Sequence, residues 1–164
     1  MKEVNQKTLN EIINNNLHVL SEFEDISTLL TRNDGVILWA GKNIDRKNHS
    51  LGALITGVWT AAKALTDTVG AENINNVLTY GGSSDGVHIL PITLAGKRFA
   101  FSVLYKKVNN PSKLKLKFRL FKQLIEDSYE EKNHLTEMID DGKEKTKALF
   151  NNITDEEIDN LFAL

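Results

Sequence analysis

The sequence contains no cysteine and only two prolines among its 164 residues. Without cysteine the chain has no disulfide bonds, no thiolate nucleophile and no zinc site built on sulfur ligands. No apolar run approaches the roughly 18 residues that a membrane span needs, and residues 1–16 lack the apolar core of a signal peptide. We therefore expect a cytoplasmic protein that inserts into no membrane.

Catalytic and metal-binding motifs are also missing. The segment GGSSDGVH (81–88) gathers Gly, Ser, Asp and His, but it has neither a Gly-x-Ser-x-Gly elbow nor a phosphate-binding Gly-Lys-Ser/Thr loop. A hairpin turn between two strands explains it better. The histidines show no metal-ligand spacing, and His88, which alternates with Val87 and Ile89, is predicted on the face of a strand. The four are His18, His49, His88 and His134. We therefore expect the chain to have no enzymatic activity, no metal site and no cofactor.

Charge is distributed unevenly although the net charge is only −2. Residues 86–125 contain nine Lys or Arg and no acid, whereas residues 126–164 contain twelve Asp or Glu against four Lys. This pattern indicates a solvated basic helix face followed by an acidic tail. A nucleic-acid surface is the alternative, but no aromatic-basic motif accompanies the lysines and the pI is about 6.1. We therefore expect no nucleic-acid partner.

Residues 50–70 form the segment around which the rest of the chain is organised. An apolar stripe at helical spacing predicts a helix that lies on a sheet. Its residues are Leu51, Leu54, Ile55, Val58, Ala62, Leu65 and Val69. The other flank holds small residues and a tryptophan, namely Gly52, Ala53, Gly57, Ala61, Ala64 and Trp59. A helix so poor in polar residues needs a second cover, and a copy of the same helix is the simplest one.

The remaining elements follow from turn and capping signals. A helix is predicted over residues 4–20, and strands 26–31 and 36–40 flank the turn Asn33-Asp34-Gly35. Further strands are predicted at 74–80, 87–94 and 98–106, and Pro91 suits a sheet edge or a bulge. Asn110 and Pro111 are then predicted to be the cap and the first residue of another helix.

The segment KLKLKFRLF (113–121) fits two patterns, because its strict alternation suits a strand while Leu114, Phe118 and Phe121 follow helical spacing. We predict a helix, since Leu, Lys and Arg are good helix formers and the stripe continues to Tyr129. Apolar residues become sparse over 130–152 and Gly142 interrupts the pattern. We expect fraying or a hinge there, leading into a mobile tail.

A short helix is predicted at the C-terminus. Thr154 and Glu157 are spaced as a capping box, and Ile153 can pack on Ile158. Ile158, Leu161 and Phe162 then form one apolar face. Such a short helix is marginal alone in water, so it either folds into the groove of a partner or packs back on its own domain. The residues alone leave both alternatives open.

The order of these elements resembles that of the Roadblock family, which includes the dynein light-chain roadblock and bacterial Roadblock regulators of polarity. Four segments carry the resemblance: LLTRNDGVILWAG (29–41), ALITGVWTAAKAL (53–65), VLTYGGSSDGVHILPI (77–92) and NNPSKLKLKFRLFKQL (109–124). The resemblance implies an α/β fold in the order α-β-β-α-β-β-β-α, with a central five-stranded antiparallel sheet and helices on both faces. This domain would cover residues 1–128, followed by a helical or flexible acidic linker (129–152) and a short amphipathic partner-binding helix (153–164).

The resemblance also implies a function. Family members dimerise through the central helix and an adjacent edge strand, which here implies an interface of Ala53, Gly57, Ala61, Ala64, Val77 and Leu78. Roadblock dimers are platforms for small Ras-like GTPases, and bacterial ones accelerate GTP hydrolysis by reshaping the GTPase. The expected GTPase-binding residues, on an exposed flank of the central helix and the loop before it, are Lys42, Arg46, Lys47, Ser50, Trp59, Lys63 and Thr66. The chain itself would not be an enzyme.

The C-terminal peptide ITDEEIDNLF (153–162) has a resemblance of its own. It is similar to the peptide with which flagellar switch proteins and the chemotaxis phosphatase hold a response-regulator receiver domain. Carried over to this sequence, the resemblance implies that the contacting residues are Asp155, Glu156, Glu157, Ile158, Asp159, Leu161 and Phe162. The phosphatase's catalytic helix is not apparent, which implies docking without dephosphorylation. We thus expect a bacterial signalling scaffold, linked to chemotaxis or motility, that binds a GTPase; the alternative is an adaptor that recruits a receiver domain and binds no GTPase.

Overall fold

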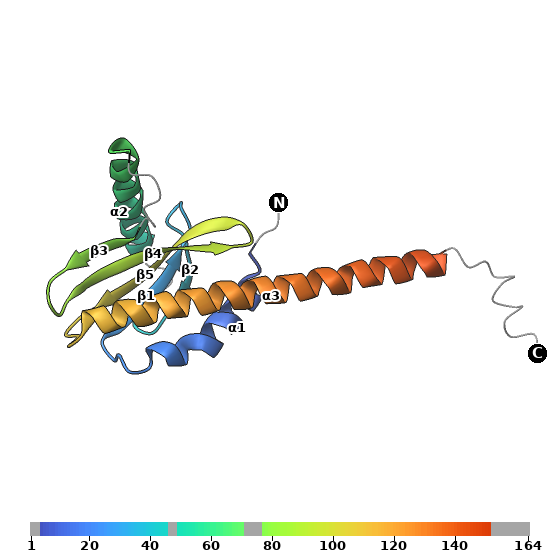
Figure 1. Cartoon of the computed structure of the whole chain (residues 1–164), viewed down its shortest axis with the longest axis horizontal. Coiled ribbons are helices and arrows are strands. Elements are labelled where there is room, and N and C mark those ends of the chain that lie inside the picture. Colours follow the sequence, from blue (N-terminus) through green and yellow to red (C-terminus); the bar gives the residue numbers. More distant parts are fainter. Residues whose placement is uncertain (1–3, 46–48, 71–76, 152–164) are drawn as a thin grey trace, which may run out of the picture. The chain divides into compact units, whose positions relative to one another are not determined.

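The computed structural model describes residues 4–45, 49–70 and 77–151, with residues 137–151 described as backbone only. The chain divides into two compact units, Met1–Tyr129 and Glu130–Leu164. Figure 1 shows the elements along the chain. They are α1 (Gln6–Asn16), the 3-10 helix η1 (Leu17–Leu20), β1 (Ile26–Thr31), β2 (Ile37–Ala40), α2 (His49–Thr68), β3 (Leu78–Gly81), β4 (Gly86–Leu94), β5 (Lys97–Tyr105) and α3 (Pro111–Asn151).

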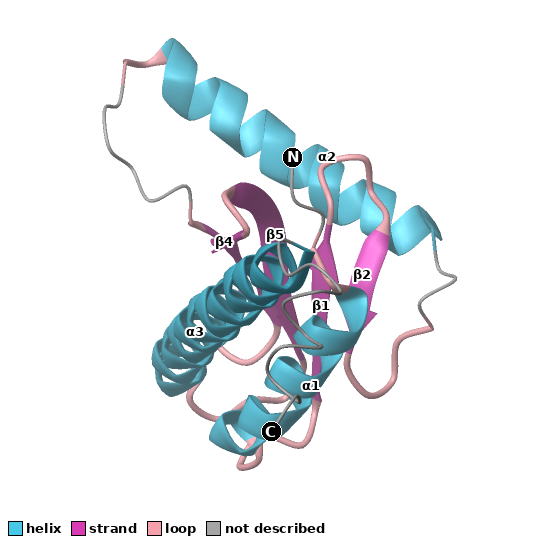
Figure 2. Cartoon of the chain, turned by 90° about the vertical axis from the view of Figure 1, so that its right-hand side faces the viewer, coloured by secondary structure: helices cyan, strands magenta, loops and turns pink. Residues whose placement is uncertain are grey.

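The strands form one antiparallel five-stranded sheet in the order β2-β1-β5-β4-β3. One face of the sheet is covered by α2, and the other by α1 and the first turns of α3 (Figure 2). The α/β fold, the order of elements and the helices on both faces are therefore as predicted. The Asn33-Asp34-Gly35 turn joins β1 to β2, with Gly35 at a φ of 84°, and GGSSDG joins β3 to β4 as a turn.

The larger core lies between the sheet and the helices α1 and α3. From α3 it receives Leu114, Phe118, Phe121, Ile125 and Tyr129. The ring of Phe118 packs on Phe101 of β5 with centroids 4.5 Å apart. These are the residues of the helical stripe, so the helical interpretation of segment 113–121 is confirmed. The expected cap is also present, because the Asn110 Oδ1 accepts a hydrogen bond from the Lys113 backbone N–H at 2.9 Å.

The C-terminal part of α3 differs from expectation. The helix continues through Gly142 to Asn151, where the sequence favoured a frayed segment or a hinge. Glycine in a helix interior costs roughly 1 kcal/mol relative to alanine, which is too little to end a helix by itself. The tail peptide 153–162 lies outside the described residues.

The smaller core lies under α2, and here one prediction is only partly right. The helix contacts the sheet through Gly52, Ile55, Thr56 and Trp59. Of the predicted stripe, Ile55 is buried and Leu51 packs against the same core, but the other large residues do not. Leu54, Val58 and Leu65 of that stripe are 65%, 47% and 69% exposed. Trp59, expected on the exposed flank, packs instead with Leu29, Ile55, Ile89 and Ala100.

The rotation of α2 is explained by a backbone contact. The helix begins directly above the β1–β2 turn, and a Cβ added at Gly52 would lie 2.0 Å from the Gly35 carbonyl oxygen. Only glycine permits this approach. One turn later the Thr56 hydroxyl donates to the Arg32 carbonyl oxygen at 3.2 Å. These contacts direct the Gly52, Thr56 and Trp59 side of the helix toward the sheet.

A buried histidine connects the edge strand to the larger core. His88 of β4 is only 1% exposed, and its Nδ1 lies 2.6 Å from the Thr79 Oγ1 of β3. Its Nε2 has no hydrogen-bond partner among the described residues, and its ring lies edge-on to Phe118. Burial lowers the pKa of His88 to about 4, helped by the positive charges of Arg119 and Lys115. The predicted strand-face position is thus confirmed.

We predict that Gly52→Ala lowers the free energy of unfolding by about 1–3 kcal/mol, because the added Cβ would force the helix away from the β1–β2 turn. Urea unfolding followed by tryptophan fluorescence measures this, since Trp59 of the same helix is buried against the sheet. Gly82→Ala is the matched control: a Cβ there meets nothing within 4 Å, so stability should change by less than about 0.5 kcal/mol. Equal effects of the two substitutions would contradict the proposed contact.

We predict that His88 makes the folded protein less stable as the pH falls. The folded state keeps His88 neutral down to a pKa of about 4, whereas the unfolded chain protonates it near 6.5. The unfolded state therefore binds more protons in this window, and the free energy of unfolding falls by up to about 1.4 kcal/mol per pH unit. Urea unfolding between about pH 7 and pH 5 should show a smaller loss for His88→Gln. His49→Gln, at an exposed position, should keep the wild-type slope.

Candidate functional site

The side of α2 directed away from the sheet carries large and small apolar residues together. At about 3.6 residues per turn, the residues farthest from the Gly52–Trp59 side fall on one continuous strip. We call this strip the outward face of α2; it consists of Leu54, Gly57, Val58, Ala61, Ala64 and Leu65, all exposed. The charged residues of α2, Lys63 and Asp67, project from other sides of the helix. The outward face is therefore both exposed and uncharged.

A groove runs beside this face. Its volume is about 560 Å³, and it is lined by Asn33, Asp34, Gly35, Ala53, Thr56, Gly57, Thr60, Ala61 and Ala64. The floor is shallow because the helix presents only small side chains there. Four of the predicted dimer-interface residues, Ala53, Gly57, Ala61 and Ala64, are thus brought together along one side of α2.

At the rim of the groove, the charged side chain of Asp34 pairs with that of Arg32. The Arg32 Nε donates to both carboxylate oxygens of Asp34 at 2.9 Å, and the Val36 backbone N–H adds a bond at 3.2 Å. The hydrogen bond from Arg32 is the largest cause that lowers the pKa of Asp34 to about 2. Asp34 is therefore ionised under ordinary conditions, and its charge is balanced by Arg32.

The other two predicted interface residues lie at the edge of the sheet. Leu78 begins β3 and Val77 precedes it; both are half-buried against the two cores. In the described part of the chain, β3 pairs only with β4, so its outer edge has no strand beside it. On the same strand Tyr80 is 77% exposed.

The residues predicted to bind a GTPase are dispersed. Ser50 and Lys63 are exposed on α2, but they stand 13 positions apart, about 20 Å along the helix axis. Thr66 is half-buried, and its hydroxyl donates to the Lys63 carbonyl oxygen at 2.7 Å. Trp59 is buried between α2 and the sheet. Arg46 and Lys47 lie outside the described residues. Among the described members of this set, the structure does not form one compact patch.

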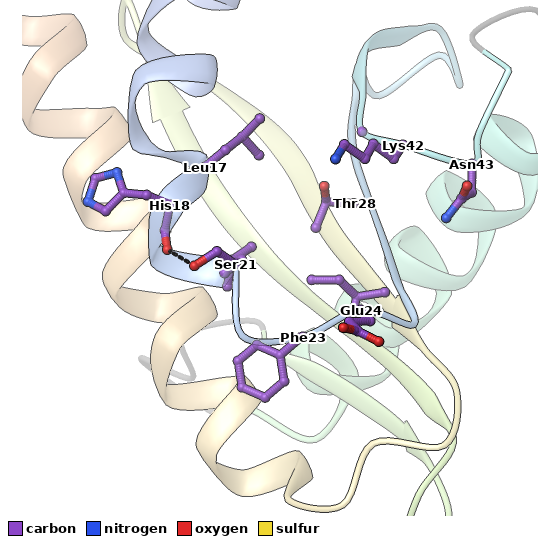
Figure 3. A pocket seen from close by; sticks show the side chains of 11 residues that line it. Leu17, His18, Ser21, Phe23, Glu24, Thr28, Lys42 and Asn43 are labelled. Carbon is purple, nitrogen blue, oxygen red and sulfur yellow. Dashed lines mark hydrogen bonds between the residues drawn. The ribbon is translucent and has the colours of Figure 1, made fainter.

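Lys42 lies beside a separate cavity that sequence reasoning missed. This cavity of about 500 Å³ is lined by Leu17, His18, Leu20, Ser21, Phe23, Glu24, Ile26, Thr28, Gly41, Lys42 and Asn43. Figure 3 shows its walls coming from η1, the start of β1 and the segment after β2. The lining residues are separated in sequence, so no motif reveals them. The only hydrogen bond drawn there joins the Ser21 hydroxyl to the His18 carbonyl oxygen, at 2.8 Å.

Metal-binding clusters and membrane-spanning helices are both absent from the described part of the chain. It holds no group of three or more His, Cys, Asp or Glu residues that could bind a metal ion. Within the same residues, no helix is long and apolar enough to cross a membrane. The exposed apolar strip and groove of α2 are consequently the strongest candidate for a functional surface.

The sequence matches no protein-family model and no curated protein. Solved structures do match. The chain is similar to MglB from Myxococcus xanthus, with a TM-score of 0.60 and 16% identity over 80% of this chain and 94% of that one. An MglB structure described as having a tetrameric arrangement gives a TM-score of 0.55 and 19% identity over 80% and 94% of the two chains. A Roadblock/LC7 domain from Streptomyces avermitilis gives 0.53 and 13% over 65% and 87%. The chain therefore has the Roadblock/LC7 fold that the resemblance in its sequence predicted.

Proposed function

We propose that the chain is a non-catalytic regulatory module that dimerises through the outward face of α2 and binds a small Ras-like GTPase. The observation that carries this proposal is the exposed, uncharged outward face of α2 beside a groove of small residues. An apolar strip of this kind is stabilised when a second surface removes it from water. The fold shared with MglB, one form of which is described as tetrameric, supports self-association.

The proposed interface combines a helix pair with a strand pair. Gly57 and Ala61 allow the backbone of a second α2 to approach closely, while Leu54, Val58 and Leu65 supply apolar area. The free edge of β3 then pairs with its copy, which extends the sheet across the dimer. Val77 and Leu78 lie at this edge.

A protein partner suits the GTPase-binding residues better than a small ligand does, because Ser50 and Lys63 alone lie about 20 Å apart along α2. The proposed GTPase-binding surface would also include Thr66, Arg46 and Lys47. Trp59 would contribute by holding α2 on the sheet. Binding would stimulate GTP hydrolysis by reshaping the GTPase, and the chemistry would remain in the partner's own site.

The tail peptide gives the module a second partner in this proposal. Residues 153–162 would dock a response-regulator receiver domain through the acidic and apolar residues named above. Its capping box favours a helix that forms on binding. If the GTPase does not bind, the chain is an adaptor for the receiver domain alone.

We predict that Gly57→Leu converts the dimer to a monomer without unfolding it. A Cβ at Gly57 meets nothing within 4 Å inside the single chain, so a larger side chain is tolerated there until a second α2 approaches. Light scattering coupled to size exclusion measures the mass, and circular dichroism measures the fold. Lys63→Leu introduces the same side chain on another side of the helix and should leave the dimer intact. A Gly57→Leu variant that remains dimeric would contradict the proposed interface.

We predict that purified Ras-like GTPases from the same cell bind the chain when loaded with a GTP analogue, and bind less when loaded with GDP. Removal of residues 150–164 should leave GTPase binding intact and abolish binding of a phosphorylated receiver domain. Pull-down with each purified partner measures both. If no GTPase binds while the receiver domain still needs the tail, the adaptor function replaces the proposed one.

A further inference from the structure

The cavity between η1 and the end of β2 contains a hydroxyl that nothing in the described chain uses. Thr28 of β1 is only 5% exposed, yet its side chain lines this cavity of about 500 Å³. Among the described residues its hydroxyl has no hydrogen-bond partner. Figure 3 shows the hydroxyl and the Lys42 amino group directed toward the same end of the cavity. Two hydrogen-bond donors are thus available to one ligand.

A glycine keeps this hydroxyl accessible. A Cβ added at Gly41 would lie 2.6 Å from the Thr28 Oγ1 and 3.2 Å from the ring of Trp39. Any side chain at position 41 would therefore cover the hydroxyl or displace it. The end of the cavity near Lys42 is open because the chain has no side chain there.

The same cavity lies where β1 loses one of its two neighbours. Strand β5 pairs with β1 along Ile26–Thr31, whereas β2 pairs with it only along Leu29–Thr31. The Gly41 backbone N–H still donates to the Thr28 carbonyl oxygen at 2.8 Å, and the chain then leaves the sheet through Asn43, at a φ of 72°. The first residues of β1 are consequently a free sheet edge within the described structure.

The backbone of Ile26 faces this free edge. On the other side of β1, the Asp25 carbonyl oxygen accepts a bond from the Lys106 backbone N–H at 3.0 Å. Because hydrogen bonds in an antiparallel pair alternate along the strand, Ile26 directs its N–H and C=O away from β5. Ile26 also lines the cavity. Its two backbone groups have no partner among the described residues.

The wall of the cavity opposite the free edge is apolar. It is formed by Leu17 and Leu20 of η1 and by Phe23. A residue paired with Ile26 in an added strand would direct its side chain to the same face of the sheet as Ile26. That side chain would enter the cavity, so one residue of a ligand can satisfy the backbone of Ile26 and fill the apolar space.

We propose that this cavity binds an extended peptide segment of a partner protein, which pairs antiparallel with Ile26 and inserts one apolar side chain. Successive residues of a strand alternate between faces, so residues two positions from the apolar one lie on the same side. Before it, an acidic side chain accepts bonds from Thr28 and Lys42. After it, a basic side chain faces Glu24, at the opposite end of the cavity from Lys42 (Figure 3).

Other ligands use only part of the site. An apolar carboxylate such as a fatty acid would use the apolar wall and Lys42, but would leave the backbone groups of Ile26 unpaired. A peptide strand uses all three features, as in recognition by strand addition elsewhere. The proposal goes beyond the proposed function and needs no GTPase. Lys42 belongs to both, whereas Thr28 and Ile26 belong to the cavity alone.

The test uses the full isotopically labelled chain and the capped peptide acetyl-Ser-Glu-Ser-Leu-Ser-Arg-Ser-amide. We expect a dissociation constant on the order of 1 mM or tighter, measured from backbone NMR shifts at Ile26, Thr28 and Gly41, and slower hydrogen exchange of the Ile26 amide. The same peptide with an N-methylated leucine cannot donate to Ile26 and should bind at least about tenfold more weakly. Equal binding of the two peptides, or tighter binding of octanoate, would overturn the proposal.

Variants of the chain test the polar end of the cavity. Thr28→Val keeps the shape of the side chain and should weaken peptide binding about tenfold, the effect of losing a hydrogen bond to a charged group. Thr93→Val, at an exposed position outside the cavity, should bind as the wild type does. Lys42→Glu should prefer a peptide in which Lys replaces Glu. Circular dichroism verifies that each variant is folded. Wild-type binding by both Thr28→Val and Lys42→Glu would contradict the proposed site.

Discussion

The arrangement of this protein depends on one backbone contact, the approach of α2 to the β1–β2 turn at Gly52. Because a Cβ at that position would lie 2.0 Å from the Gly35 carbonyl oxygen, no other residue allows the helix to lie so close. The contact fixes the rotation of α2, and with it the side that Trp59 and Thr56 bury. Whatever is not directed to the sheet is thereby presented to solvent, including three large apolar side chains.

This rotation has an energetic consequence for assembly. Fully burying a leucine or valine contributes roughly 1.5–3 kcal/mol, so Leu54, Val58 and Leu65 carry several kcal/mol that the single chain leaves unused. A helix whose larger residues faced the sheet would have gained that free energy within one chain. In the proposed dimer this gain would come from a second copy of α2, which the small residues beside the groove would allow to approach closely.

The fold could be predicted largely from the sequence, because its signals are local. Asp34-Gly35 marks a tight turn, Asn110 and Pro111 begin a helix, and the spacing from Leu114 to Tyr129 decides between helix and strand. The rotation of α2 could not be predicted, since both of its sides are apolar and the deciding contact joins Gly52 to a turn seventeen positions earlier. The burial of His88 was missed for a similar reason: it depends on Phe118 and Thr79, which come from two other elements.

The two exposed surfaces differ in the force that acts on them, and this separates their roles. The outward face of α2 is uncharged, so association through it depends on apolar area and responds little to salt. The first turns of α3 instead carry the cations Lys115, Lys117 and Arg119, and the interactions of charges at a solvent-exposed surface are screened over about 10 Å at 0.1 M ionic strength. A contact of the first kind suits a lasting assembly.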